Sequence, residues 1–185
     1  FGATGFTGLG NEALEAEGTI SVANANELSA FSTGLAKAAL GSETKLTLDA
    51  LTSSSNEYSV TVTDPSIDAG DLNAINAKTA GLVTVDATAI TGALTDVKAA
   101  YAANSAGTIS ALGNESVAIS DSGSVLASDV NFINGLTAGV ITLNNVSTVK
   151  GLASEVLTTY AANTAGTVTG LGNEDIILTD TSLAA

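Results

Sequence analysis

The segment 101–122, YAANSAGTISALGNESVAISDS, returns 59 positions later as Tyr160–Thr181, YAANTAGTVTGLGNEDIILTDT. Self-similarity on this scale is typical of repeat proteins, in which each unit buries its apolar face on the next. The sequence therefore predicts an array of stacked units and not a domain built around one pocket.

An Asn-Glu pair closes each copy and lets the period be traced toward the N-terminus. These corner residues are Asn11, Glu12, Asn56, Glu57, Asn114, Glu115, Asn173 and Glu174, at spacings of 45, 58 and 59. We expect one elongated repeat domain over 1–185, with units near 12–56, 57–114 and 115–173 and a further unit starting in 174–185. The chain begins with Phe1, and its start and its end match the same part of the repeat. We therefore also expect a processed protein or a piece of a longer array.

Six short runs with a strand-like pattern each end in Asp or Asn. The runs are 45–49, 60–64, 82–86, 117–121, 140–144 and 176–180. Val60 and Val62 alternate with threonines, as in a strand with one buried face. The run 140–143 is apolar on both sides and fits a sheet covered by helices. Further short strands are expected at 108–110 and 167–169, after Gly107 and Gly166, which we expect to adopt positive φ.

Between the strands the apolar spacing changes from two to three or four. Short helices are predicted over 71–77 and 129–135, and longer ones around 97–101, 152–160 and 25–40. Crossovers between parallel strands are right-handed by default. The predicted fold is therefore an α/β repeat solenoid with parallel strands on one side and short helices on the other. An all-β right-handed β-helix is the alternative.

Charge and hydropathy exclude several classes of protein. Nineteen Asp and Glu stand against five Lys, which gives a net charge of −14 and no basic patch for nucleic acid. No apolar run approaches the ~18 residues that span a bilayer, so no membrane span is predicted. An acidic surface suits a salty extracellular medium, where screening is strong.

The residues that the chain lacks argue against catalysis. Without His and Cys there is no ordinary near-neutral general base, no thiolate nucleophile and no zinc-thiolate site. A glycosidase with paired carboxylates remains as an alternative, but aromatic residues, which stack on sugars, make up only 4% of the chain. We expect no enzyme.

The polar residues at the strand ends have two interpretations. In the first, their side chains accept backbone N–H groups and form a structural ladder of Asp49, Asp64, Asp86, Asp121, Asn144 and Asp180. In the second, calcium is bound by Asp64, Asp68, Asp71, Asp121 and Asp129. The sequence contains neither an EF-hand loop nor a Gly-Gly-x-Gly-x-Asp nonapeptide, so we favour the ladder and expect no cofactor.

The corners and the tyrosines also have structural and functional interpretations. In the structural interpretation, Asn tolerates the left-handed backbone of a bend and Glu is simply solvated. In the functional interpretation, Glu12, Glu57, Glu115 and Glu174 form an acidic stripe that binds cations or a basic partner. Tyr101 and Tyr160 are expected in the core. Threonines spaced as in ice-binding faces occur at 61–63 and 167–169, but the other strands break the pattern.

The stretch Thr79–Asp121 has the form TAGxVTVxATxITGxxxDVxAAYAAN…GTISxLGNExVxISD. It resembles the tandem repeats of giant cell-surface proteins of marine cyanobacteria of the Synechococcus and Prochlorococcus type, and the resemblance extends over roughly 56–185. The resemblance implies an acidic, secreted or surface-attached protein associated with surface layers, adhesion or motility. It brings no catalytic residues with it.

A solenoid leaves sheet and core uncovered at both ends, and stacking head to tail covers them. We therefore expect an extracellular structural repeat protein that forms a homo-oligomer or polymer through its ends, as a filament or surface layer, or a module of a larger adhesin or motility protein. The alternative is a calcium- or glycan-binding adhesion module, with cell-surface polysaccharide as the partner.

Overall fold

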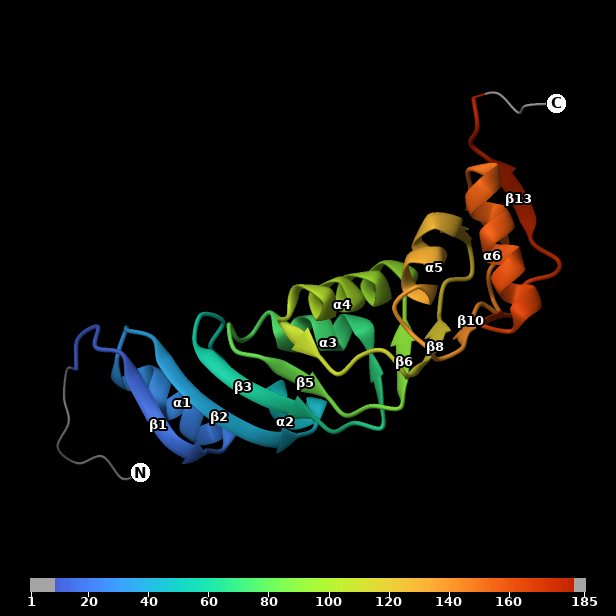
Figure 1. The fold of residues 1–185 in the computed structure, drawn as a ribbon. Coiled ribbons are helices and arrows are strands. Elements are labelled where there is room, and N and C mark those ends of the chain that lie inside the picture. The colour runs from blue at the N-terminus through green and yellow to red at the C-terminus, as the bar shows by residue number, and fades with distance from the viewer. Residues whose placement is uncertain (1–8, 182–185) are drawn as a thin grey trace. The chain divides into compact units, whose positions relative to one another are not determined.

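The computed structural model describes residues 9–181, and within that range it contains thirteen strands and six helices. All the strand pairs in it are parallel. The chain is therefore an α/β protein, and the all-β alternative is wrong because helices connect the strands (Figure 1). No helix in the described range is long and apolar enough to cross a membrane, in agreement with the sequence.

The chain divides into two compact lobes. Among the described residues, the first lobe comprises 9–65, 71–87 and 103–111. Its five-stranded sheet has the order β1-β2-β3-β5-β7. The elements are β1 (Leu14–Thr19), α1 (Val22–Phe31), β2 (Ala36–Glu43), α2 (Lys45–Leu48), β3 (Glu57–Val62), most of α3 (Ala69–Asn76), β5 (Val83–Val85) and β7 (Ile109–Ser110). Helix α1 lies against β1 and β2 (Figure 1).

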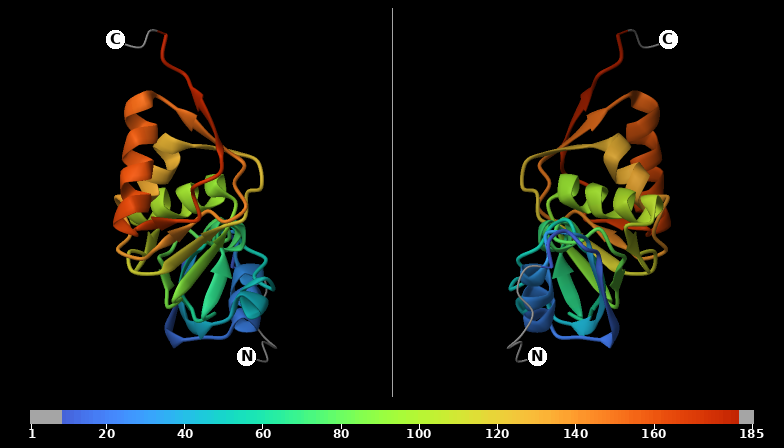
Figure 2. Two further views of the ribbon diagram at one scale, coloured as in Figure 1. Left: turned by 90° about the vertical axis from the view of Figure 1, so that its right-hand side faces the viewer. Right: turned by 90° about the vertical axis from the view of Figure 1, so that its left-hand side faces the viewer.

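Among the described residues, the second lobe comprises 66–70, 88–102 and 112–181. It contains a five-stranded sheet of order β12-β10-β8-β6-β4 and a three-stranded sheet of order β13-β11-β9. Its strands are β4 (Ser66–Asp68), β6 (Ala89–Gly92), β8 (Ser116–Ile119), β9 (Ser124–Leu126), β10 (Ile141–Thr142), β11 (Thr148–Gly151), β12 (Val168–Thr169) and β13 (Asp175–Leu178). Its helices are most of α4 (Leu94–Ala106), α5 (Ala127–Asn134) and α6 (Ala153–Ala165). Helices α5 and α6 lie together beside the three-stranded sheet (Figure 2).

Strand pairing advances along the chain in steps of similar length. We define a step as the stretch of chain between a residue and its partner on the next strand of the same sheet. One step runs from Lys37 to Glu57, and another runs from Ile141 to Val168. Each step returns the chain in the same direction, so the pairing can only be parallel. Every strand thus pairs with strands that lie close to it in chain order.

The core consists of columns of small and branched side chains that the register brings into line. Val60, Val83 and Ile109 form one column in the first lobe, and Val117, Ile141 and Val168 form another in the second. All six are at most 5% exposed. Branched residues suit such columns because they pack well on a pleated surface.

Five of the six predicted strands are present at β3, β5, β8, β10 and β13, and the extra short strands are β7 and β12. The predicted short helices are α3 and α5, and the longer ones are α4 and α6. The expected positive φ is found at Gly107 and Gly166, at 81° and 80°. The strands β1, β4, β6, β9 and β11 were not predicted.

The predicted strand over 45–49 is wrong, because Lys45–Leu48 forms helix α2. A strand would place Leu46 and Leu48 on one face. In the helix they separate, so Leu48 is buried while Leu46 is 82% exposed. Lys45 and Asp49 then stand one turn apart and form an ion pair of 2.8 Å. Asp49 therefore follows a helix and not a strand.

The predicted helix over 25–40 is wrong in its second half. Helix α1 ends at Phe31, and β2 begins at Ala36. The break lies at Ser32-Thr33-Gly34, where the Ser32 hydroxyl accepts the Gly34 N–H at 2.9 Å. A hydroxyl that binds nearby backbone competes with helical hydrogen bonds. The apolar spacing of Leu28, Phe31 and Leu35 therefore runs on past the end of the helix.

Three glycines lie where one backbone touches another. A Cβ on Gly34 would overlap the carbonyl oxygens of Asn11 and Glu12, one on Gly81 would lie 2.5 Å from the Tyr58 carbonyl, and one on Gly139 would overlap the Glu115 carbonyl. Each glycine thus allows the main chain to pass against the preceding Asn-Glu corner. At these positions, direct backbone contact sets the distance between neighbouring passages of the main chain.

We predict that Gly139→Ala lowers the free energy of unfolding by about 1–3 kcal/mol, because the methyl group would force the two backbones apart. Gly123→Ala is the matched control, since an added Cβ at Gly123 meets no atom within 4 Å. Urea unfolding followed by circular dichroism measures both variants. Equal midpoints for the two would contradict the close approach.

Candidate functional site

The best-defined polar site of the second lobe is the corner before β8. The Glu115 side chain turns back, so that its Oε2 accepts the N–H groups of Gly113 at 2.7 Å and Asn114 at 3.2 Å. The Tyr101 hydroxyl, from α4, donates to the same oxygen at 3.2 Å. Glu115 is only 5% exposed and Tyr101 is fully buried. A buried carboxylate that accepts three hydrogen bonds closes the turn between α4 and β8.

The corner of the following repeat has the same contacts. Glu174 accepts the Gly172 N–H at 2.8 and 2.9 Å through its two oxygens, and the Tyr160 hydroxyl at 2.9 Å. In both corners the tyrosine precedes the glutamate by 14 residues. The expectation that Glu is simply solvated therefore does not describe Glu115, which the structure buries. The corners at Glu115 and Glu174 therefore share a hydrogen-bonded Tyr-Glu pair.

The corner of the first lobe uses Asn in place of Glu. Asn56 is 6% exposed, its Oδ1 accepts the Ala36 N–H at 2.8 Å, and its amide donates to the Tyr58 hydroxyl at 3.2 Å. Tyr58 in turn donates to the carbonyl of Ala25 at 2.9 Å. Glu57 points to the surface, 3.8 Å from the Lys37 ammonium group.

The first Asn-Glu pair is open to solvent. Asn11 and Glu12 are both exposed, and the Glu12 carbonyl accepts the Ser32 hydroxyl. The four glutamates therefore occupy different environments.

A hydroxyl bridge joins each of the first three corners to the following step, and sequence reasoning missed it. Thr137 accepts the Gly139 N–H at 2.9 Å and donates to the Glu115 carbonyl at 3.3 Å. Thr79 accepts the Gly81 N–H at 2.9 Å and donates to the carbonyls of Asn56 and Tyr58. Ser32 makes the equivalent contacts in the first step. The available signal was Ser-x-Gly or Thr-x-Gly at 32–34, 79–81 and 137–139, in phase with the repeat.

Three strand-end aspartates cap helices that lie one step earlier in the chain. Asp64 accepts the N–H of Lys45 at 2.6 Å, Asp121 that of Leu94 at 2.7 Å and Asp180 that of Ala153 at 2.8 Å. These donors are the first residues of α2, α4 and α6. A carboxylate at a helix N-terminus satisfies a free N–H and complements the helix dipole.

The other ladder candidates do not share this arrangement. Asp49 pairs with Lys45 and lies 4.0 Å from the Lys78 ammonium group. Asp86 is exposed, and Asn144 places its Oδ1 close to Gly170. The strand-end residues thus separate into three long-range caps and three positions with individual surroundings.

The calcium candidates lie apart or already have partners. Asp68 accepts the Gly70 N–H at 2.9 Å, Asp71 lies 3.4 Å from the Lys45 ammonium group, and Asp129 pairs with Lys98. Asp64 and Asp121 are two of the helix caps. Across residues 9–181, no group of three or more acidic side chains is placed to hold a metal ion.

Burial shifts the ionisation of the tyrosines. It raises the pKa of Tyr101 to about 12, and the nearby Glu115 carboxylate adds to the rise. It also raises the pKa of Tyr160 to about 12, with a contribution from Glu174, and raises the pKa of Tyr58. At Glu174, burial acts to raise the pKa, but hydrogen bonds from Gly172, Tyr160 and the corner backbone outweigh it and the pKa is lowered.

We predict that Glu115→Ala lowers the free energy of unfolding by about 2–3 kcal/mol, because it leaves the Tyr101 hydroxyl and the Gly113 N–H buried without this acceptor. Glu12→Ala, at the exposed corner, should change it by less than about 0.5 kcal/mol. Chemical denaturation of both variants at neutral pH measures the difference. A loss at Glu115 no larger than at Glu12 would show that the buried corner does not stabilise the fold.

We predict that the folded protein shows no tyrosine ionisation near pH 10. The three tyrosines are Tyr58, Tyr101 and Tyr160, and the pKa of each is raised above 10.0 by burial. A raised folded-state pKa means that the stabilising contribution is complete below pH 10 and is lost as the pH rises toward 12. Absorbance at the tyrosinate band, with and without urea, tests this. Ionisation of more than one tyrosine near pH 10 in the native protein would contradict the raised pKa values of Tyr101 and Tyr160.

The corner contacts are hydrogen bonds that hold backbone segments together. Their carboxylates accept N–H and O–H groups of the chain itself.

No protein-family model, no curated protein and no solved structure matches the chain.

Proposed function

We propose that this chain is a structural repeat module whose strands and helices stack as a solenoid, parallel strands on one side and helices on the other. The observation that carries the proposal is the recurrence of the same contacts at repeat spacing. The pair of Tyr101 and Glu115 recurs as Tyr160 and Glu174, and the contact of the Thr79 hydroxyl with the Gly81 N–H recurs between Thr137 and Gly139. Contacts that recur with the sequence period belong to the repeat and not to a single site.

The contacts also join each step to the next. Asp121 reaches back 27 residues to the N-terminus of α4, and Thr137 reaches back 22 residues to the corner at Glu115. Asn131 of α5 donates to the carbonyl of Glu155 in α6, 24 residues ahead. Nearest-neighbour links of this kind are how repeat proteins obtain stability without long-range contacts. The links between successive steps therefore support a structural role for the chain.

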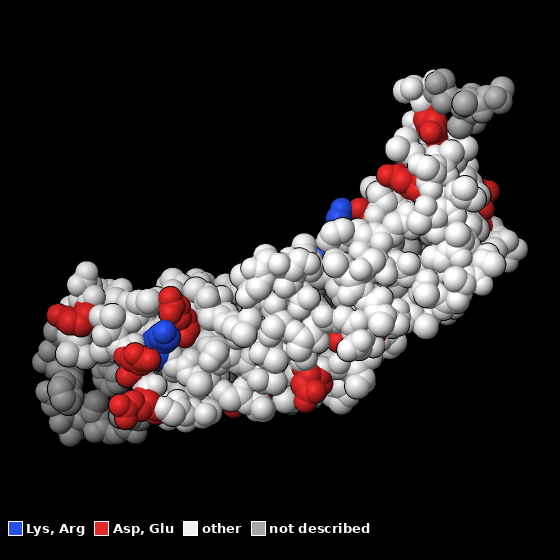
Figure 3. Space-filling view, in the orientation of Figure 1, with Lys and Arg blue, Asp and Glu red and all other residues white. Residues whose placement is uncertain are grey.

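The surface favours an extracellular setting. Carboxylates make up most of the charged side chains on the face shown in Figure 3, in keeping with the net charge of −14. The resemblance to cyanobacterial cell-surface repeats points the same way. We propose that the protein is secreted or surface-attached, and that it either assembles head to tail into a filament or layer or forms one module of a larger adhesin or motility protein. We further propose that it is not an enzyme.

The second candidate is a glycan-binding adhesion module, and one groove favours it. The solvent face of the sheet in the first lobe has an open groove of about 450 Å³, with Glu15, Lys37, Glu57 and Ser59 among its lining residues. Hydroxyl and charged groups on a broad sheet face suit an extended polysaccharide. The related calcium-binding candidate has no comparable observation in its favour.

Electron microscopy of the purified chain tests the proposed function. Filaments of constant diameter and defined axial repeat are expected, in a buffer without divalent cations. Thermal unfolding with and without calcium, and with cell-surface polysaccharide, gives the comparison. Dispersed single particles that gain thermal stability on adding calcium or glycan would favour the binding module instead.

A further inference from the structure

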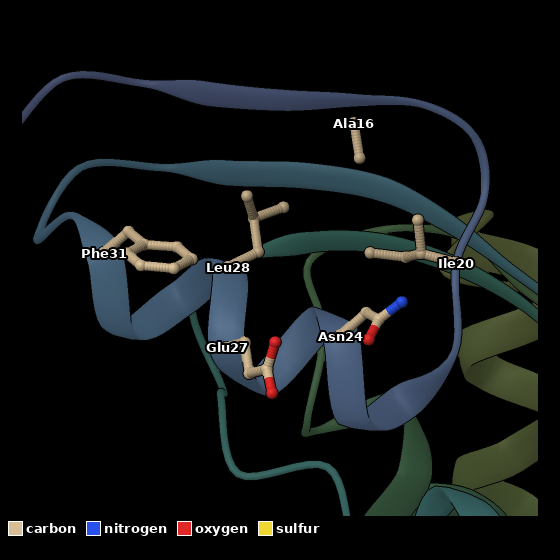
Figure 4. A pocket seen from close by; sticks show the side chains of 6 residues that line it. All are labelled: Ala16, Ile20, Asn24, Glu27, Leu28 and Phe31. Carbon is tan, nitrogen blue, oxygen red and sulfur yellow. The ribbon is translucent and has the colours of Figure 1, made fainter. Parts of the chain in front are cut away.

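Helices α1 and α2 of the first lobe are held in place by different interactions. Helix α1 has ten residues, and its Leu28 and Phe31 rise toward strand β1 around a small cavity that Ala16 and Ile20 also line (Figure 4). Helix α2 has only four residues, and Leu48 is its buried side chain. Helices shorter than about 12 residues are marginal in water. Helix α2 therefore depends on contacts outside its own turn.

Four charged side chains supply such contacts. The Lys45 ammonium group lies 2.8 Å from the Asp49 carboxylate and 3.4 Å from that of Asp71 in α3. The Lys78 ammonium group donates to the main-chain carbonyl of Asp49 at 2.6 Å and lies 4.0 Å from its carboxylate. A cation that binds the last carbonyls of a helix satisfies free acceptors and complements the helix dipole. We call Lys45, Asp49, Asp71 and Lys78 the α2 ion cluster.

The short first unit explains why α2 needs the α2 ion cluster. From the first residue of the helix to the Asn of the next corner, the chain advances 11 positions in the first unit, from Lys45 to Asn56. The advance is 20 positions in each later unit, from Leu94 to Asn114 and from Ala153 to Asn173. Helices α4 and α6 have 13 residues each and support themselves by their own hydrogen bonds. In the first unit, charged side chains replace that internal support.

We propose that the segment 45–55 is a salt-sensitive element that opens by itself while the sheet of the first lobe stays folded. The four side chains of the α2 ion cluster are all partly exposed, between 27% and 45%. Salt screens exposed charges, and the screening length falls from about 30 Å at 0.01 M to about 3 Å at 1 M. The apolar columns of the sheet carry no charge to screen. The inference concerns this lobe alone and does not depend on the proposed assembly.

Opening changes the surface that the first lobe presents. Leu48 and Leu51 belong to the segment and are only 1% and 5% exposed. Asn26 of α1 also holds the segment, since it donates to the Ala50 carbonyl at 2.8 Å and accepts the Thr52 N–H at 3.0 Å. When the segment leaves these partners, the two leucines become accessible to solvent. The element thus couples the salt concentration to the exposure of apolar side chains.

Hydrogen exchange of the native full chain, followed by NMR, tests the proposal. The N–H groups of Leu48, Asp49 and Leu51 donate to carbonyls three or four positions earlier and report on α2. The N–H of Val60 donates across the sheet to the carbonyl of Leu82 and reports on the sheet. Raising the salt from about 0.01 M to about 1 M should speed exchange at the α2 reporters about threefold or more relative to Val60.

A pair of lysine variants tests whether the α2 ion cluster controls the opening. Lys45→Met removes the central cation and keeps an unbranched side chain. It should speed exchange at the α2 reporters about threefold or more at low salt and reduce their dependence on salt. Lys37→Met is the matched control, because it removes the same charge from an ion pair of the same lobe, 3.8 Å from Glu57 on the sheet. It should leave the α2 reporters unchanged.

Acid provides a second readout. The hydrogen bond from Lys45 holds the pKa of Asp49 below its ordinary value of 3.8. A lowered folded-state pKa means that the stabilising contribution of Asp49 is complete above pH 3.8 and is lost as the pH falls through the folded-state pKa. Asp71, and Asp64, which accepts the Lys45 N–H, are further carboxylates in contact with α2. In Lys45→Met the pKa of Asp49, measured by NMR, should return toward 3.8, and in Lys37→Met it should not move.

Three outcomes would overturn the proposal. They are α2 reporters that exchange no faster than Val60 at any salt concentration, exchange that does not respond to salt, and a control Lys37→Met that speeds exchange as much as Lys45→Met. The salt series on the unaltered chain decides the matter where Lys45→Met does not fold.

Discussion

The return of the chain at its Asn-Glu corners depends on side-chain acceptors for the backbone N–H groups there. At the two full corners a carboxylate does this: Glu115 and Glu174 each accept a glycine N–H and a tyrosine hydroxyl. At the earlier corner Asn56 accepts the N–H of Ala36. Without an internal acceptor, such groups cost free energy on leaving water. The parallel pairing of successive strands follows from corners that are closed in this way.

Hydrogen bonds then connect what the corners have positioned. Asp64, Asp121 and Asp180 fix the starts of three helices from the ends of later strands. Ser32, Thr79 and Thr137 tie each corner to the next passage of the chain. These groups act on the backbone, and the core is built mostly of small and branched side chains, with Tyr58 and Tyr101 as buried aromatic residues. The low aromatic content of 4% agrees with a core of this composition.

Sequence patterns anticipated the α/β class and most elements, because alternation and helical spacing record burial directly. The pattern failed at 45–49, where Leu46 and Leu48 alternate as in a strand but one turn of helix separates them. The helical spacing also gave a wrong prediction at 32–34. There the Ser32 hydroxyl binds the Gly34 N–H and α1 ends, although the apolar spacing continues. The burial of Glu115 could not be predicted from composition, because it depends on Tyr101, 14 residues away, reaching the same turn. The hydroxyl bridges were missed because each joins residues twenty or more positions apart.

The contacts at Gly34, Gly81 and Gly139 set the distance between successive passages by main chain against main chain. Side-chain volume has little influence on a spacing fixed in that manner. Outward-facing residues are therefore free to differ from one passage of the chain to another while this spacing stays constant. A chain built in this way can vary its surface chemistry along its length on an unchanging frame.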